Sequence, residues 1–155
     1  IKQLIACYLL DGDKTMAVLQ YKVGLGNVGS YQVSGKPFAS GNIDAQVGSG
    51  GTHGDGSVAI HFPTVTRWVQ VNNSGSVDLR VGFSAFGLTG TNYLLVKADT
   101  ELGPLELKVT ELHLTGGVSG GTSVMAGCTF IPTDSINNLS VSSGGSNWSG
   151  SAGVG

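Results

Sequence analysis

Charged side chains are scarce in this 155-residue sequence. Asp, Glu, Lys and Arg make up only 12% of it, whereas an ordinary globular protein is about 25% charged. The eight basic residues are scattered between Lys2 and Lys108, and the net charge is −2. Because duplex nucleic acid is bound through clustered Lys and Arg, we expect no direct nucleic-acid partner. Weak self-repulsion also predicts poor solubility for an isolated monomer, which favours a subunit of an assembly.

Cysteine and long apolar runs are equally sparse. Cys7 and Cys128 each lie in an apolar, strand-like run, without CxxC or metal-ligand spacing. Two interpretations stay open: two buried thiols that pack as small hydrophobes, or a disulfide that would imply an oxidising environment. No apolar run approaches the roughly 20 residues that span a bilayer, so we expect no membrane partner. Ile1 opens directly into a strand-like pattern without the basic segment of a signal peptide.

Helical spacing is also missing, whereas glycine is abundant. No window carries Ala, Glu, Lys and Leu at helical spacing, yet 40% of the residues are hydrophobic and 26 are Gly. This composition is typical of many short strands joined by tight turns, and it excludes a disordered chain. We expect one β domain at residues 1–132, long enough to bury a core, and an extended tail at residues 133–155.

The clearest alternation lies in residues 64–88, which we expect to form the centre of the domain. A polar turn at 72–75 separates two alternating runs, which predicts an antiparallel hairpin. One face is predicted to enter the core and consists of Val77, Leu79, Val81 and Phe83. The opposite face is predicted to point outward and consists of Thr66, Trp68, Gln70, Asp78 and Arg80.

Other runs predict the remaining strands. A first hairpin is expected at residues 1–23, and further strands at residues 57–62, 93–98, 105–114 and 124–130. The segment 99–104 is expected to turn, and a change of apolar phase after Val109 predicts a β-bulge near Thr110–Glu111. Eight or nine short strands with Gly-rich turns predict an all-β, two-sheet antiparallel sandwich of jelly-roll type. An immunoglobulin-like sandwich is the alternative.

Residues 24–56 differ from the rest because they are rich in Gly and Ser. They predict a long loop with one short strand candidate at residues 31–33. A loop of this length is uncommon unless a partner orders it or it has a function. Its stretch GSGGTHGDG (48–56) lacks the GxxxxGK[ST] pattern, and no helix follows it, so we expect no phosphate binding.

Few residues have side chains suited to catalysis or metal binding. His61 and His113 fall in strands, where rim or packed positions are expected, while His53 lies beside Asp55 in the Gly-rich loop and could bind a cation or titrate. Two candidate ligands are fewer than an ordinary metal site needs. No Gly-x-Ser-x-Gly precedes a helix, and no Cys lies near a His. We therefore expect no enzyme activity, no catalytic residue, no metal site and no cofactor.

Residues 67–98 and the strand LELKVTELHL (105–114) resemble jelly-roll structural proteins of virus particles. The similarity is to small capsid accessory or decoration proteins of double-stranded DNA viruses and tailed phages. The tail SINNLSVSSGGSNWSGSAGVG (135–155) has the low charge that is typical of chains on a virion surface. The resemblance implies a non-enzymatic subunit on the capsid surface of a virion, which caps or bridges other capsid subunits as a symmetric homo-oligomer.

The subunit contacts are expected in the loop and the tail, with one from the central hairpin. Apolar and aromatic residues exposed there would act as anchors across subunits: Val28, Phe38, Ile43, Trp68, Ile136, Leu139 and Trp148. A competing class is a carbohydrate- or cell-surface-binding β-sandwich module. In that class Trp68 would be a platform on which a sugar stacks, although a rim or core aromatic explains it equally.

Overall fold

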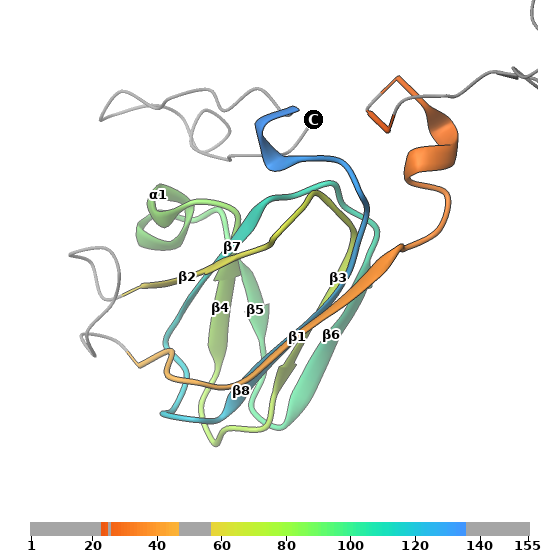
Figure 1. Cartoon of the computed structure of the whole chain (residues 1–155). Coiled ribbons are helices and arrows are strands. Elements are labelled where there is room, and N and C mark those ends of the chain that lie inside the picture. The colour runs from red at the N-terminus through yellow and green to blue at the C-terminus, as the bar shows by residue number, and fades with distance from the viewer. Residues whose placement is uncertain (1–22, 25, 47–56, 136–155) are drawn as a thin grey trace, which may run out of the picture.

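The computed structural model describes residues 23–24, 26–46 and 57–135, and Figure 1 shows a sandwich of strands. The first predicted hairpin, Cys7, His53, Asp55 and most of the tail lie outside these residues. The strands are β1 (Lys36–Ile43), β2 (Val58–His61), β3 (Thr66–Asn73), β4 (Leu79–Gly82), β5 (Leu94–Val96), β6 (Thr100–Leu105), β7 (Glu111–Thr115) and β8 (Thr122–Cys128). Three short helices accompany them: η1 (Val28–Ser30), α1 (Ala85–Thr89) and η2 (Thr133–Ser135).

The strands form two four-stranded antiparallel sheets. Sheet A has the order β1-β8-β3-β6 and sheet B the order β2-β7-β4-β5. Successive strands cross between the sheets except at β4 and β5, so the first strand lies beside the last and the second beside the seventh. This strand order is that of a jelly roll and confirms the predicted fold class. The immunoglobulin-like alternative is excluded by the strand order.

The core lies between the two sheets. Its fully buried side chains alternate along the strands and include Val69, Val71, Leu79, Val81, Leu112, Leu114, Val124 and Ala126. Burying a side chain of this size stabilises the fold by about 1.5–3 kcal/mol. Phe38 and Phe62 meet edge to face inside the sandwich, with ring centroids 5.1 Å apart. A smaller cluster of Val65 and Ile131, covered by Tyr31, closes one end.

The predicted central hairpin does not exist as a hydrogen-bonded pair. β3 pairs with β6 and β8, whereas β4 pairs with β5 and β7 in the other sheet. The polar residues 74–78 turn the chain from one sheet to the other, and this leaves Val77 42% exposed. Leu79 and Val81 are buried as predicted. Thr66, predicted to face outward, is buried, and its hydroxyl is satisfied there by donating to the carbonyl of Leu107 at 2.7 Å.

The second arm of that predicted hairpin ends in a short helix rather than a strand. In α1 the hydroxyl of Ser84 accepts a hydrogen bond from the amide of Gly87 at 3.0 Å, which caps the turn. Leu88 then packs over Gly82 of β4, where a Cβ atom would meet the Leu88 side chain at 3.0 Å. Gly82 therefore leaves room for the helix on the outer face of sheet B.

Residues 99–114 also differ from prediction. The segment expected to turn forms β6, and the segment expected to continue as a strand crosses from sheet A to sheet B between Leu105 and Glu111. The change of apolar phase near Thr110 thus marks a change of sheet and not a β-bulge. Local alternation could not distinguish the two, because both reverse which side of the chain is buried.

The long loop predicted at residues 24–56 contains the edge strand β1, which pairs with β8. Pro37, Ser40, Gly41 and Asn42 weaken its strand signal in the sequence. Proline is tolerated because β1 lies at the edge of sheet A. Beyond the end of β8, Phe130 is 54% exposed, whereas its neighbour Ile131 is buried.

Candidate functional site

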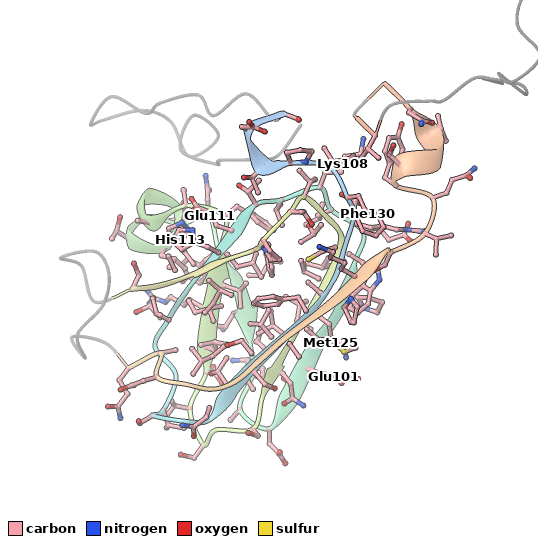
Figure 2. All side chains as sticks on the ribbon, viewed as in Figure 1. Glu101, Lys108, Glu111, His113, Met125 and Phe130 are labelled. Atoms are coloured by element: carbon pink, nitrogen blue, oxygen red, sulfur yellow. The ribbon has the colours of Figure 1, made fainter. Side chains whose placement is uncertain are left out.

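Exposed apolar side chains gather at the end of the sandwich where β8 finishes. Among the described residues, four of the eight large hydrophobic residues that are exposed lie in residues 23–33 or at Phe130. Val28 is 57% exposed and Val33 74%. Figure 2 shows Phe130 at the same end of the molecule as Lys108, beside the segment that carries η1. We call Val28, Val33 and Phe130 the end surface.

Backbone contacts join the two segments of the end surface. The amide of Gly35 donates to the carbonyl of Cys128 at 2.9 Å, and the hydroxyl of Ser34 donates to the same carbonyl at 3.3 Å. A Cβ atom at residue 35 would collide with the Phe130 ring. Glycine therefore lets this ring lie against residues 34–36, next to Val33.

Two cations border the end surface. The ammonium group of Lys36 lies 5.6 Å from the centroid of the Phe130 ring, and that of Lys108 lies 4.0 Å from the Tyr31 ring. Both distances fall within the range of a cation–π contact. The end surface thus combines apolar anchors with positive charge at its border, a composition suited to protein contact.

Trp68 lies on the outer face of sheet A. It pairs with Gly127 of β8, where a Cβ atom would collide with the indole ring. The half-buried Trp68 lines a hollow of about 280 Å³ together with Gln70, Pro104 and Glu106. Aromatic, amide and carboxylate groups therefore share one shallow site on this face.

The outer face of sheet B carries polar residues from β4 and β7 and from the residues that flank β5. Arg80 is exposed, and its guanidinium lies 4.6 Å from the centroid of the Tyr93 ring. Asp78 accepts hydrogen bonds from the ammonium group of Lys97 at 2.8 Å and from the amide of Ala98 at 3.1 Å. These bonds, that of Lys97 first, lower the pKa of Asp78 because they stabilise its charged form.

A carboxylate joins two imidazoles on the same face. Glu111 Oε2 lies 3.0 Å from His61 Nδ1, and Glu111 Oε1 lies 3.2 Å from His113 Nε2. Figure 2 shows Glu111 and His113 together near α1. The spacing of Glu111 and His113 places them on one face of β7, whereas His61 comes opposite Glu111 only through the pairing of β2 with β7. The carboxylate therefore orients both rings, one exposed and one buried.

The residues predicted as subunit contacts separate into three groups. Val28 is exposed and Trp68 is half-buried. Phe38 and Ile43, predicted to be exposed, belong to the core because β1 points them between the sheets, and Ile43 is only 7% exposed. Ile136, Leu139 and Trp148 lie outside the described residues. The sequence analysis did not identify Val33 and Phe130 as contacts, since both fell in expected strands, at residues 31–33 and 124–130.

Cys128 is a buried, free thiol at the end of β8. Burial raises its pKa, with a smaller opposing effect of hydrogen bonding to Thr64. This agrees, for Cys128, with the interpretation of a thiol that packs as a small hydrophobe. In the described part of the chain, no group of three or more His, Cys, Asp and Glu side chains is arranged to hold a metal ion. None of the helices described is long and apolar enough to cross a membrane.

Comparisons with known proteins leave the family open. No family model matches the sequence, and no curated protein is significantly similar to it. The crystal structure of PirA is similar, with 13% sequence identity and a TM-score of 0.30. That match covers 64% of this chain and 98% of PirA. A TM-score this low supports no argument about function, so the jelly-roll sandwich itself is the class that the structure defines.

Proposed function

We propose that this chain is a non-enzymatic structural subunit of a virus particle, an accessory or decoration protein on the capsid surface. The observation that carries the proposal is the end surface. Val28, Val33 and Phe130 are each more than half exposed, although they occupy one end of a sandwich whose core residues are almost completely buried. An apolar group of this kind on a rigid domain favours burial against a neighbouring protein.

The composition of the end surface supports an interface anchored by aromatic contact. Phe130 offers an exposed aromatic ring, and Gly35 leaves room for this ring beside the backbone. Lys36 and Lys108 would lie at the polar border of the interface. Aromatic residues near the centre of an interface commonly contribute most of the binding free energy. The partners in this proposal are other capsid subunits, including copies of the chain itself.

The predicted contacts of the tail belong to the same proposal. The last described residues, 133–135, lie at the same end of the sandwich as the end surface (Figure 1). Ile136, Leu139 and Trp148 follow them in the sequence. Removing residues 136–155 should therefore weaken incorporation into particles while the sandwich stays folded.

Coexpression with the major capsid protein of the same genome tests the proposal. The full chain should sediment with the particles, and a Val33→Ser, Phe130→Ser double variant should lose at least about tenfold in incorporation, since each tenfold corresponds to about 1.4 kcal/mol. Met125→Ser is the matched control, because Met125 is 47% exposed on the outer face of sheet A. Absence of the wild-type chain from particles, or equal losses in the double variant and the control, would contradict the proposal.

The site around Trp68 favours a second candidate, a carbohydrate- or cell-surface-binding module. An indole ring beside Gln70 and Glu106 offers an apolar face and hydrogen-bonding groups to a neutral sugar. A glycan array separates the two candidates. A defined sugar that binds the wild-type chain and is lost in Trp68→Ala would support the second, whereas the structural-subunit proposal expects no sugar at this site.

A further inference from the structure

The outer face of sheet B contains a hollow of about 510 Å³ that the proposed function does not use. Its floor is formed by three residues side by side on neighbouring strands. Arg80 of β4 lies opposite Leu95 of β5 on one side and opposite Thr115 of β7 on the other. The flanking residues Leu79 and Val81 are buried, so Arg80 must point outward.

Residues of the helix α1 and Gly116 form two of the walls. Leu88 is held over Gly82 and closes one side of the hollow. Gly87 contacts the backbone of Asn92 so closely that a Cβ atom would lie 2.8 Å from its carbonyl oxygen. Gly116 adopts a φ of +91° at the opposite side, a conformation that favours glycine. The volume lies within the range of about 300–1,000 Å³ that small-molecule sites occupy.

Arg80 is the charged group in the hollow that is able to bind an anion. Asp78 also lines the hollow, but both of its oxygens accept hydrogen bonds from Lys97 and Ala98. Arg80 contacts the Tyr93 ring, and within the described part of the chain it forms no ion pair with a carboxylate. Within the same part of the chain the guanidinium donates no hydrogen bond to another residue, so its N–H groups are open to a ligand.

The remaining lining groups define the rest of the ligand. A planar guanidinium edge matches a carboxylate through two parallel hydrogen bonds. Thr115 offers a hydroxyl for hydrogen bonding, while Leu95, which is 47% exposed, offers apolar contact. A compact molecule with one carboxylate, several hydroxyl groups and a C–H surface fits all three kinds of group. Inorganic phosphate, in contrast, has no C–H surface to contact Leu95.

We infer that this hollow binds an acidic monosaccharide, with its carboxylate on Arg80 and a hydroxyl group on Thr115. We call it the Arg80 site. Binding at this site requires only the folded domain, and the site lies on the other sheet from Trp68. The inference is therefore independent of the proposed role in a particle and of the second candidate function.

Titration of the full chain with sodium D-glucuronate, followed by two-dimensional amide NMR at constant ionic strength, tests the inference. Saturable shifts are expected at the amides of Arg80, Leu95, Thr115 and Gly116. D-glucose lacks the carboxylate and inorganic phosphate lacks the sugar, so neither should saturate these shifts. Saturation by phosphate with equal affinity would overturn the inference, because the site would then be a nonspecific anion site. Absence of saturable shifts with glucuronate would overturn it as well.

Substitutions test whether glucuronate binds at the Arg80 site. Arg80→Gln should weaken glucuronate binding at least about tenfold, because it removes a charge-assisted, two-bond contact. Arg80→Lys should weaken it less, and Thr115→Val should weaken it about threefold without changing the charge. Lys36→Gln is the matched control, since it also removes one exposed positive charge beside an aromatic ring but lies on sheet A. Equal weakening by Lys36→Gln and Arg80→Gln would overturn the inference.

Discussion

The side chain of Asn73 donates a hydrogen bond from Nδ2 to the backbone carbonyl of Val96 at 3.2 Å, and so connects β3 of sheet A to β5 of sheet B. The same amide group donates to the carbonyls of Val77 and Lys97, and Oδ1 accepts from the amide of Gly75. Asn73 is fully buried. Its four polar contacts therefore satisfy backbone groups that the crossing between the sheets would otherwise leave unpaired.

Replacing Asn73 with Ala should lower the free energy of unfolding by roughly 2–4 kcal/mol, because several buried carbonyls lose their donor. Chemical denaturation measures the change. Asn72→Ala is the matched control: Asn72 is its exposed neighbour on the same strand, and the change should stay within about 0.5 kcal/mol. Equal stability of the two variants would show that the hydrogen bonds of Asn73 do not stabilise the fold.

A side chain at Gly127 should displace Trp68 from sheet A. A Cβ atom at this position would meet the indole ring and the side chain of Ser34. Gly127→Ala should therefore lower the free energy of unfolding by about 1–3 kcal/mol and shift the Trp68 fluorescence, measured in a Trp148→Phe background. Gly41→Ala is the control, since nothing lies within 4 Å of a Cβ atom there. An unchanged emission spectrum in Gly127→Ala would contradict the packing of the indole on this glycine.

The ion pair of Asp78 and Lys97 should make stability depend on acidic pH. The pKa of Asp78 in the folded state is lowered from the usual 3.8, chiefly by the hydrogen bond from Lys97. The stabilisation is therefore complete above the unfolded pKa and is lost as pH falls through the lower folded pKa. Asp78→Asn should reduce the melting temperature at neutral pH more than at about pH 2, and Lys97→Gln should flatten the same dependence. Equal reductions at both pH values would contradict this interpretation.

The thiol of Cys128 should react slowly in the folded protein. It is buried, and its pKa is raised by that burial, so little thiolate is present near neutral pH. In a Cys7→Ser background, iodoacetamide should modify Cys128 at a rate that rises by at least about a hundredfold in denaturant, because the thiolate is the reactive form. Rapid modification under native conditions would show that the end of β8 opens readily.

The core could be predicted from sequence where alternation was uninterrupted. Leu79 and Val81 were assigned to the interior and are buried there. Val77 was assigned to the same face but is exposed, because it lies before the start of β4. The alternation in the sequence extends beyond the strand itself. The ends of strands are therefore where the prediction failed.

The candidate sites depended more strongly on tertiary structure. Glu111 and His113 share a face by their spacing, but His61 joins them only when β2 pairs with β7. Arg80 was assigned to the outer face correctly, yet its neighbours Leu95 and Thr115 come from strands whose pairing the sequence did not reveal. Phe38 and Ile43 were placed in a loop because Pro, Gly and Asn obscure the strand signal of β1.

The sequence by itself determined the all-β class, the low charge and the inward face of β4. These properties are local, because side chains alternate along any extended chain whatever its partner. Only the tertiary structure decided which sheet each strand enters, because pairing joins residues as distant as Lys36 and Cys128. That choice separates β3 from β4 and brings β1 beside β8. It also creates both the end surface and the Arg80 site, since each combines residues from segments far apart in the chain.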